Sequence, residues 1–201
     1  MLDRYALALI RPPIDSMARV LVRAGVGANA VTLTGFCVGL VAAVLIAACA
    51  YSAGLAALLA SRLCDGLDGA VARQTTATDA GGFLDITLDF VFYASIPLAF
   101  ALADPQANAL AAAVLLAAFI GTGSSFLAFA VMAAKRGMTS TALPDKSFYF
   151  LGGLTEATET LLFFMAMCLW PQHFAVLAYT FATLCAITIV SRIWWGWKAF
   201  A

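Results

Sequence analysis

The chain has 201 residues, of which 64% are hydrophobic and only 11% charged, and its mean hydropathy is +0.97. A soluble domain of this length does not need so much apolar surface to build its core, so the composition excludes a soluble globular protein. The chain is predicted to be an integral membrane protein. We expect membrane lipid around it and no nucleic-acid partner.

The first 25 residues mix arginines with apolar side chains, and Pro12 and Pro13 interrupt them. This stretch has no uninterrupted apolar run and no cleavage site, which argues against a signal peptide. We predict an amphipathic segment over residues 1–25 that lies on the inner membrane surface, with the proline pair dividing two short helices. A partly disordered basic tail is the alternative.

Apolar runs of about 20 residues, enough to cross a hydrocarbon core of about 30 Å, predict six transmembrane helices. In chain order they cover residues 31–50, 54–73, 82–103, 107–133, 148–170 and 174–195. The predicted fold is therefore an all-α, polytopic membrane protein, with a six-helix bundle over 31–195. We expect a single membrane domain over residues 1–201 and no soluble second domain.

Basic residues are distributed unevenly between the two ends of these helices. The connectors at 50–53, 104–107 and 170–173 carry no Lys or Arg. The opposite ends carry Arg4, Arg11, Arg19, Arg23, Arg73, Lys135, Arg136, Lys146, Arg192 and Lys198. The positive-inside rule then places both termini in the cytoplasm.

Four carboxylates lie at the cytoplasmic ends of the second and third predicted helices: Asp65, Asp68, Asp85 and Asp89. A carboxylate in hydrocarbon costs several kcal/mol, roughly 2.5 to 3.5 on insertion scales, so residues placed there are candidates for function. At about 100° per residue, each pair projects from one face of its helix. The short connector near 74–81 makes the two helices antiparallel neighbours, so we expect the two acidic faces to meet.

Several carboxylates together favour a hard divalent cation, Mg²⁺ or Mn²⁺, over zinc. Four acids exceed what one Mg²⁺ usually recruits, and two ions about 3.5 to 4 Å apart would account for them. The alternatives are a proton path or ion pairs with Arg62 and Arg73, although two arginines leave four acids with excess negative charge. The only histidine, His173, is predicted in an outer loop, away from the acids.

Glycines are interleaved with the acids. Gly66 and Gly69 remove side chains near the acidic face, which would let a phosphate or nucleotide approach the helix backbone. Gly81 and Gly82 are expected to form a sharp turn into the third helix, whose free N–H groups favour an anion. Close helix packing is the alternative role for such glycines.

The complete pattern is Asp65-x2-Asp68-Gly69-x2-Ala72-Arg73-x7-Gly81-x3-Asp85-x3-Asp89. It resembles the signature of the class I CDP-alcohol phosphotransferases, membrane enzymes of phospholipid synthesis. The predicted helices and the amino-terminal segment extend this resemblance over essentially the whole chain. The runs 79–92 and 146–156 resemble, more narrowly, a bacterial inner-membrane branch described as phosphatidylglycerophosphate-synthase-like, a label that does not establish the acceptor.

The resemblance implies roles for individual residues. Asp65, Asp68 and Asp85 would bind the two divalent ions, while Asp89 would act as general base and also contact a metal. Gly69 and Arg73 would lie against the CDP moiety, with Gly81 shaping the pocket. Family members often open the first helix with Pro-Asn-x2-Thr-x2-Gly; here Ala28 replaces the proline, while Asn29 and Thr32 remain as candidate nucleotide contacts. Asn29 as a simple helix cap is equally compatible with the sequence.

The expected reaction is transfer of a substituted phosphate from CDP-diacylglycerol to a small alcohol, with release of CMP. Lys135, Arg136 and Lys146 would bind a phosphorylated acceptor or only satisfy the topology rule. Glu156 and Glu159, predicted two to three turns inside the fifth helix, would line an acceptor pocket or pair with Arg62.

Two other classes of function stay open. A cation or proton transporter also places acids in membrane helices, and a non-catalytic membrane subunit could retain the same fold. The clustering of the acids at one end favours the enzyme. The resemblance further suggests a homodimer and a bacterial inner-membrane location with the active site facing the cytoplasm; the sequence itself does not decide the oligomeric state.

Overall fold

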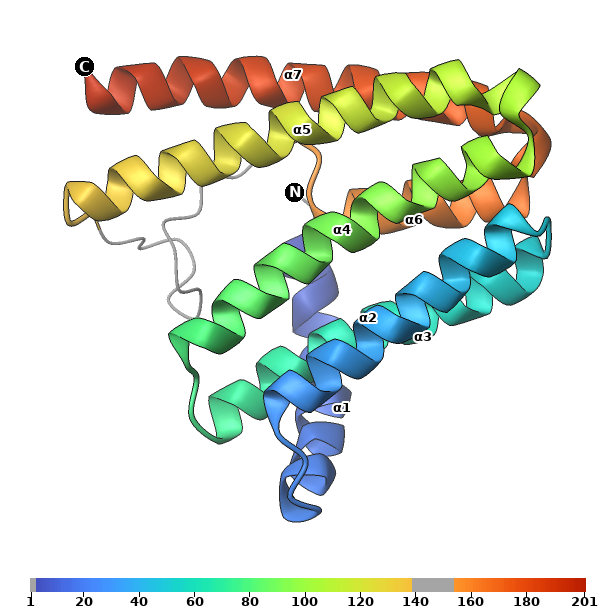
Figure 1. Ribbon diagram of the computed structural model, residues 1–201. Coiled ribbons are helices and arrows are strands. Elements are labelled where there is room, and N and C mark those ends of the chain that lie inside the picture. Colours follow the sequence, from blue (N-terminus) through green and yellow to red (C-terminus); the bar gives the residue numbers. More distant parts are fainter. Residues whose placement is uncertain (1–2, 139–153) are drawn as a thin grey trace.

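The computed structural model describes residues 3–138 and 154–201, with side chains from residue 11 onward. All regular structure in these ranges is helical, as predicted (Figure 1). The elements are α1 (Asp3–Arg23), α2 (Ala28–Ala47), α3 (Tyr51–Gln74), α4 (Asp79–Ala103), α5 (Pro105–Lys135), α6 (Ala157–Leu169), the short 3₁₀ helix η1 (Pro171–His173) and α7 (Phe174–Phe200).

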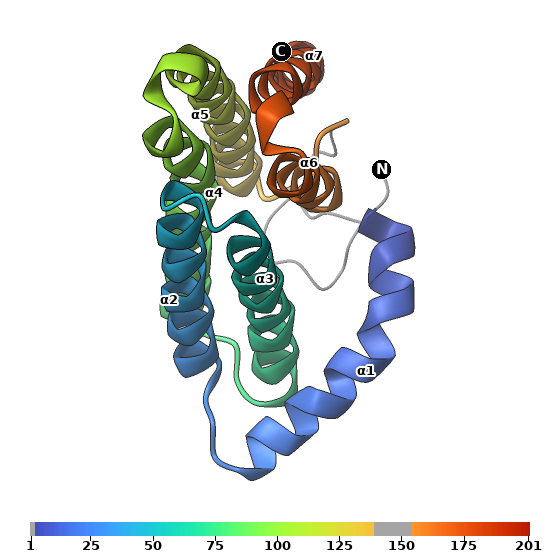
Figure 2. The same ribbon diagram turned by 90° about the vertical axis from the view of Figure 1, so that its right-hand side faces the viewer.

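Helix α2 packs against both α3 and α4, while α5 packs against α4 and α7. Helix α6 contacts α3 and α7, which closes the bundle (Figure 2). Helices α3 and α4 were predicted to be direct neighbours, but most of the packing of each is against α2. The two acidic helices contact each other through charged side chains, and α2 packs along both of them.

Within residues 3–138 and 154–201, four helical stretches are long and apolar enough to cross a membrane: α2, α4, α5 and Pro171–Phe200. Helix α3 has 24 residues, which is long enough to cross a membrane, but Arg62, Asp65, Asp68 and Arg73 make its composition too polar for an apolar span. The described part of α6 has 13 residues, and part of the predicted 148–170 helix lies outside the described residues. Six spans thus remain a prediction.

The turns explain small shifts in the helix boundaries. The link between α2 and α3 covers residues 48–50, three residues earlier than the predicted helix bounds imply: Cys49 adopts a left-handed conformation (φ 60°), and α3 already begins at Tyr51. Thr78 caps α4 by accepting a hydrogen bond from the Gly81 N–H at 3.1 Å. Gly81 and Gly82 therefore lie within the first turn of α4, and the connector predicted near 74–81 ends earlier than expected, at Thr78.

Helix α1 runs without a break through Pro12 and Pro13, so the expected division into two short helices is wrong (Figure 2). Each of the two prolines lacks a backbone N–H donor, but the fixed φ of proline is close to the helical value, so the helix can continue. Ala18 of α1 is fully buried against Ala70 and Val71 of α3. The segment thus packs on the acidic helix; its placement on the membrane surface stays a prediction.

Candidate active site

Three of the four predicted acids lie together where the carboxyl-terminal half of α3 meets the amino-terminal half of α4. Asp65, Asp68 and Asp85 each direct one carboxylate oxygen to a common point, with these atoms within 4.8 Å of one another. Asp68 is only 5% exposed, and its buried Oδ2 atom has no hydrogen-bond partner among the described residues. A buried carboxylate oxygen without a donor, beside two more carboxylates, is an arrangement that a cation would stabilise.

A cavity of about 420 Å³ opens beside these acids. It is lined by Ala28, Asn29, Thr32, Asp68, Gly69, Ala72, Arg73, Thr76, Ala77, Thr78, Gly81, Gly82, Asp85, Ile86, Asp89, Phe90, Tyr93 and Phe126. The residues predicted to bind metal or nucleotide line it, except Asp65. Gly66 does not line it either: a Cβ there would lie 2.9 Å from Ile14 Cδ1 of α1, which supports the packing alternative for this glycine. Asp65 lies instead on an adjoining small void, which Asp68, Asp85 and Asp89 also line. The fold thus gathers α2, α3 and α4 residues around one space.

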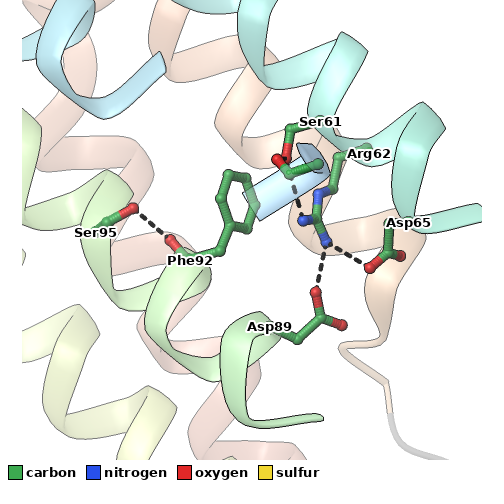
Figure 3. Close-up of polar contacts among 7 residues, drawn as sticks. Ser61, Arg62, Asp65, Asp89, Phe92 and Ser95 are labelled. Carbon is green, nitrogen blue, oxygen red and sulfur yellow. Dashed lines mark hydrogen bonds and ion pairs between the residues drawn. The ribbon is translucent and has the colours of Figure 1, made fainter. Parts of the chain in front are cut away.

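Asp89 forms an ion pair rather than joining the three-carboxylate cluster. Arg62 Nη1 lies 2.8 Å from Asp89 Oδ1 and 3.3 Å from Asp65 Oδ1 (Figure 3). Ion pairs between these acids and Arg62 were an alternative that the sequence left open, and the structure shows two of them. Spacing alone did not single out the partner on α4, which lies 27 residues further along the chain. One arginine therefore links the acidic faces of α3 and α4.

The glycine at the start of α4 has a specific neighbour. A Cβ on Gly81 would lie 2.9 Å from Asn29 Oδ1 and 3.1 Å from Thr78 Oγ1, which is closer than side chains normally approach. Gly27 holds the capping position of α2 and Asn29 lies within its first turn, so the reading of Asn29 as a helix cap is wrong. Thr32 donates its hydroxyl proton to the Ala28 carbonyl at 3.1 Å.

Arg73 lies near the glycine that precedes it by one turn. A Cβ on Gly69 would come within 3.4 Å of Arg73 Nη1, so the absence of a side chain leaves the guanidinium room beside the helix backbone. On its other side Arg73 Nη2 lies 3.8 Å from Asp15 Oδ1 of α1. Helix α1 thus contacts a residue of the cavity wall.

One wall of the cavity is aromatic and was not predicted from the sequence. It consists of Phe90 and Tyr93 of α4 and Phe126 of α5. Gly123 makes room for this wall, because a Cβ there would lie 2.5 Å from Phe90 Cε1. The position of Tyr93, four residues after Asp89, was an available signal, since residues four apart lie on the same face of a helix. Nothing local in the sequence indicated Phe126.

Glu156 and Glu159 lie at the beginning of α6 and not inside it. Glu156 is the capping residue and Glu159 reaches back to the Glu156 N–H at 3.2 Å, forming a capping box. The prediction that they lie two to three turns into a helix is wrong, because α6 begins at Ala157. The ion-pair partners of Arg62 are Asp65 and Asp89, so the structure gives no support to a pair between Arg62 and these glutamates.

The basic residues between α5 and α6 have separate surroundings. Arg136 donates from Nη1 to the Ala199 carbonyl at 3.2 Å, which places its charge at the carboxyl end of α7. Lys135 is exposed in the last turn of α5, and Lys146 lies outside the described residues. His173 is exposed in η1, as expected for a loop residue.

Comparison of the sequence with known families finds a match to the CDP-alcohol phosphatidyltransferase model over residues 26–195. The chain is 51% identical over 197 residues to the inner membrane protein YnjF of Escherichia coli, covering 98% of this chain and 96% of that one. It is also 45% identical over 82 residues, 40% of each chain, to the archaetidylinositol phosphate synthase of Methanothermobacter thermautotrophicus.

The fold is similar to crystal structures of the Mycobacterium tuberculosis phosphatidylinositol phosphate synthase PgsA1. With CDP-DAG bound, that enzyme superposes with a TM-score of 0.73 at 23% identity, covering 92% of this chain and 93% of the other. Its complex with manganese and citrate gives a TM-score of 0.72 at 22% identity, covering 92% and 88%. At these identities the likeness concerns the fold.

Proposed function

This chain belongs to the CDP-alcohol phosphatidyltransferase family, and from that membership we propose that it transfers a phosphatidyl group from CDP-diacylglycerol to a small alcohol, releasing CMP. The observation that carries the proposal is the common cavity, into which the residues of the sequence pattern converge from three helices. We further propose a multi-pass inner-membrane protein with this cavity open to the cytoplasm, as suggested by the basic residues and by the name of the Escherichia coli relative.

The donor would occupy the cavity with its nucleotide between α2 and the amino end of α4. Gly69 and Gly81 present backbone without side chains on two sides of this space, and Asn29 offers an amide beside Gly81. Arg73, which also lines the cavity, supplies a cation suited to a phosphate oxygen. The acyl chains would stay in the bilayer, where the apolar outer surfaces of the helices lie.

Asp65, Asp68 and Asp85 would hold the divalent ions. The fit rests on their converging oxygens and on the partnerless Oδ2 of Asp68, a set of hard oxygen donors that suits Mg²⁺ or Mn²⁺. Bound ions would neutralise the pyrophosphate charge and polarise the bond to the departing CMP. We propose two ions, and the manganese complex of the structural relative supports the choice of cation.

Asp89 would act as the general base. Its carboxylate lines the cavity with its side chain 31% exposed, so an alcohol can reach it. The hydroxyl oxygen of the acceptor forms a bond to the phosphorus that carries the diacylglycerol, and the bond from that phosphorus to the CMP oxygen breaks. The hydroxyl proton passes to Asp89, a role worth about 10² to 10⁴ in rate.

The test uses purified protein with CDP-diacylglycerol, Mg²⁺ and a panel of alcohols that includes glycerol 3-phosphate, inositol and inositol phosphate. We expect CMP release and a new phospholipid with one acceptor class, and loss of about 10²-fold or more in kcat for Asp89→Asn. Ion flux in liposomes without CMP release would support the transporter alternative. Donor binding without turnover by any acceptor would support the non-catalytic alternative.

A further inference from the structure

Arg62 is a buried cation that the transfer reaction described above does not use. Its side chain is 12% exposed, and its Nη1 atom contacts Asp89 Oδ1 at 2.8 Å and Asp65 Oδ1 at 3.3 Å. Only the first of these is a hydrogen bond. Arg62 thus contacts a proposed metal ligand on its own helix and the proposed base on another helix.

Uncharged groups also contact the guanidinium group, while its buried Nε atom has no hydrogen-bond partner among the described residues. The guanidinium lies over the ring of Phe92, with the central carbon 3.9 Å from the ring centroid, and Nη2 lies 3.3 Å from Ser61 Oγ. Ser61 in turn donates to the Gly35 carbonyl of α2 at 2.7 Å. Three helices therefore determine the position of one planar group.

Phe92 is itself immobilised. It is fully buried, and a Cβ on Gly39 of α2 would lie 2.5 Å from its Cδ2 atom, so the ring is pressed against the α2 backbone. A rigid aromatic floor leaves the guanidinium little freedom to tilt. Because Arg62 is fixed, the carboxylate oxygen that it binds is fixed as well.

We propose that Arg62 is a positioning residue for the reaction: it holds Oδ1 of Asp89 so that the other carboxylate oxygen faces the acceptor. Figure 3 shows that second oxygen directed away from the guanidinium. A planar group that is stacked and hydrogen-bonded orients a carboxylate better than a lysine ammonium, which contacts it as a point charge. The inference rests on the proposed function, because it assigns Asp89 the role of base.

The test is a kinetic cycle on the full-length chain with CDP-diacylglycerol, Mg²⁺ and the acceptor identified by the panel. Arg62→Met should lower kcat by about 10²-fold in the parent chain, the loss expected from a displacement of about 1 Å. In an Asp89→Asn background the same change should cost less than about threefold, because the group that Arg62 orients is already inactive. The donor KM should stay within about threefold of the parent value.

A second variant covers the case in which Arg62→Met does not accumulate as folded protein. Arg62→Lys keeps the charge and should lower kcat by about 10-fold with an unchanged donor KM. Arg23→Met, at an exposed arginine of α1, is the matched control and should keep the parent kcat. Full activity of Arg62→Lys would overturn the proposal.

Three further outcomes are decisive. Equal losses in the parent and Asp89→Asn backgrounds would show a general structural role and overturn the inference alone. Recovery of the Arg62→Met kcat at saturating Mg²⁺ would show that Arg62 acts through Asp65, which also overturns it. A parent chain that releases no CMP with any acceptor overturns the proposed function and this inference together.

Discussion

The two halves of the pair α3 and α4 fill the space between helices in opposite ways. In the apolar half, Leu58, Ile96 and Phe100 are fully buried, and Phe100 stacks on Phe174 with ring centroids 4.6 Å apart. In the acidic half, the same helices carry carboxylates and glycines around a cavity of about 420 Å³. One end is closed by packing, and the other is left open for a ligand.

Phe92 lies where the two halves meet. One side of its surroundings is the aromatic core, with the Tyr93 ring 5.5 Å away, and the other is the guanidinium of Arg62. The polar site therefore rests on the apolar core, since the buried ring of Phe92 sets the position of the Arg62 guanidinium. Changes in the two halves should therefore affect different measurements.

The largest expected effect on the reaction rate comes from the acidic half of α3 and α4. Chelation of divalent ions, or Asp68→Asn, should lower the rate of CMP release by about 10³-fold or more, because the charge of the pyrophosphate would no longer be neutralised. Asp79→Asn is the matched control: Asp79 lies on α4, is exposed and does not line the cavity, so its variant should keep parent activity. Undiminished CMP release in excess chelator would contradict the metal site.

The next largest effect, on the stability of the fold, is expected in the apolar half. Phe100→Ala should destabilise the folded protein by about 3 kcal/mol, because it leaves a cavity in the stacked core. The kcat of the remaining folded protein should change by less than about twofold. Unfolding in detergent and active-site titration measure the two quantities. Phe83→Ala, at a phenylalanine 72% exposed on the same helix, should change stability little.

The adjacent glycines Gly81 and Gly82 differ in their surroundings, so they test the packing requirement within the site. Gly81→Ala should raise the donor KM by about 10-fold, because the new methyl group would displace Asn29, as expected for overpacking of 1 kcal/mol or more. Gly82→Ala should have a smaller effect, since Gly82 lines the cavity but nothing in the protein lies within 4 Å of a Cβ there. Equal effects of the two changes would indicate a backbone requirement in the first turn of α4 and not the contact with Asn29.

The smallest effect is expected at the contact between α1 and the site. Asp15→Asn should change the donor KM by about twofold at low salt, because the pair with Arg73 spans 3.8 Å and both side chains are partly exposed. The difference should disappear at about 1 M salt, where such charges are screened. A large effect that persists at high salt would show that Asp15 contributes more than this ion pair.

Local sequence determined much of this protein. Composition indicated a membrane protein, and the spacing of Asp65 with Asp68 and of Asp85 with Asp89 placed each pair on one helix face, because a helix turns about 100° per residue. The apolar runs located five of the helices to within a few residues of their observed bounds. The resemblance to the family singled out Asn29, Gly69, Arg73 and Gly81, which all line the cavity.

Only the tertiary structure decided which groups meet. Helical periodicity gives the direction of a side chain on its own helix but not the partner that faces it. The pairing of Arg62 with Asp89, the place of Phe126 in the cavity wall and the capping role of Glu156 and Glu159 all depend on where helices begin and how closely they approach. At Gly39 and Gly123 that approach is set by neighbouring rings, and no local pattern specifies it.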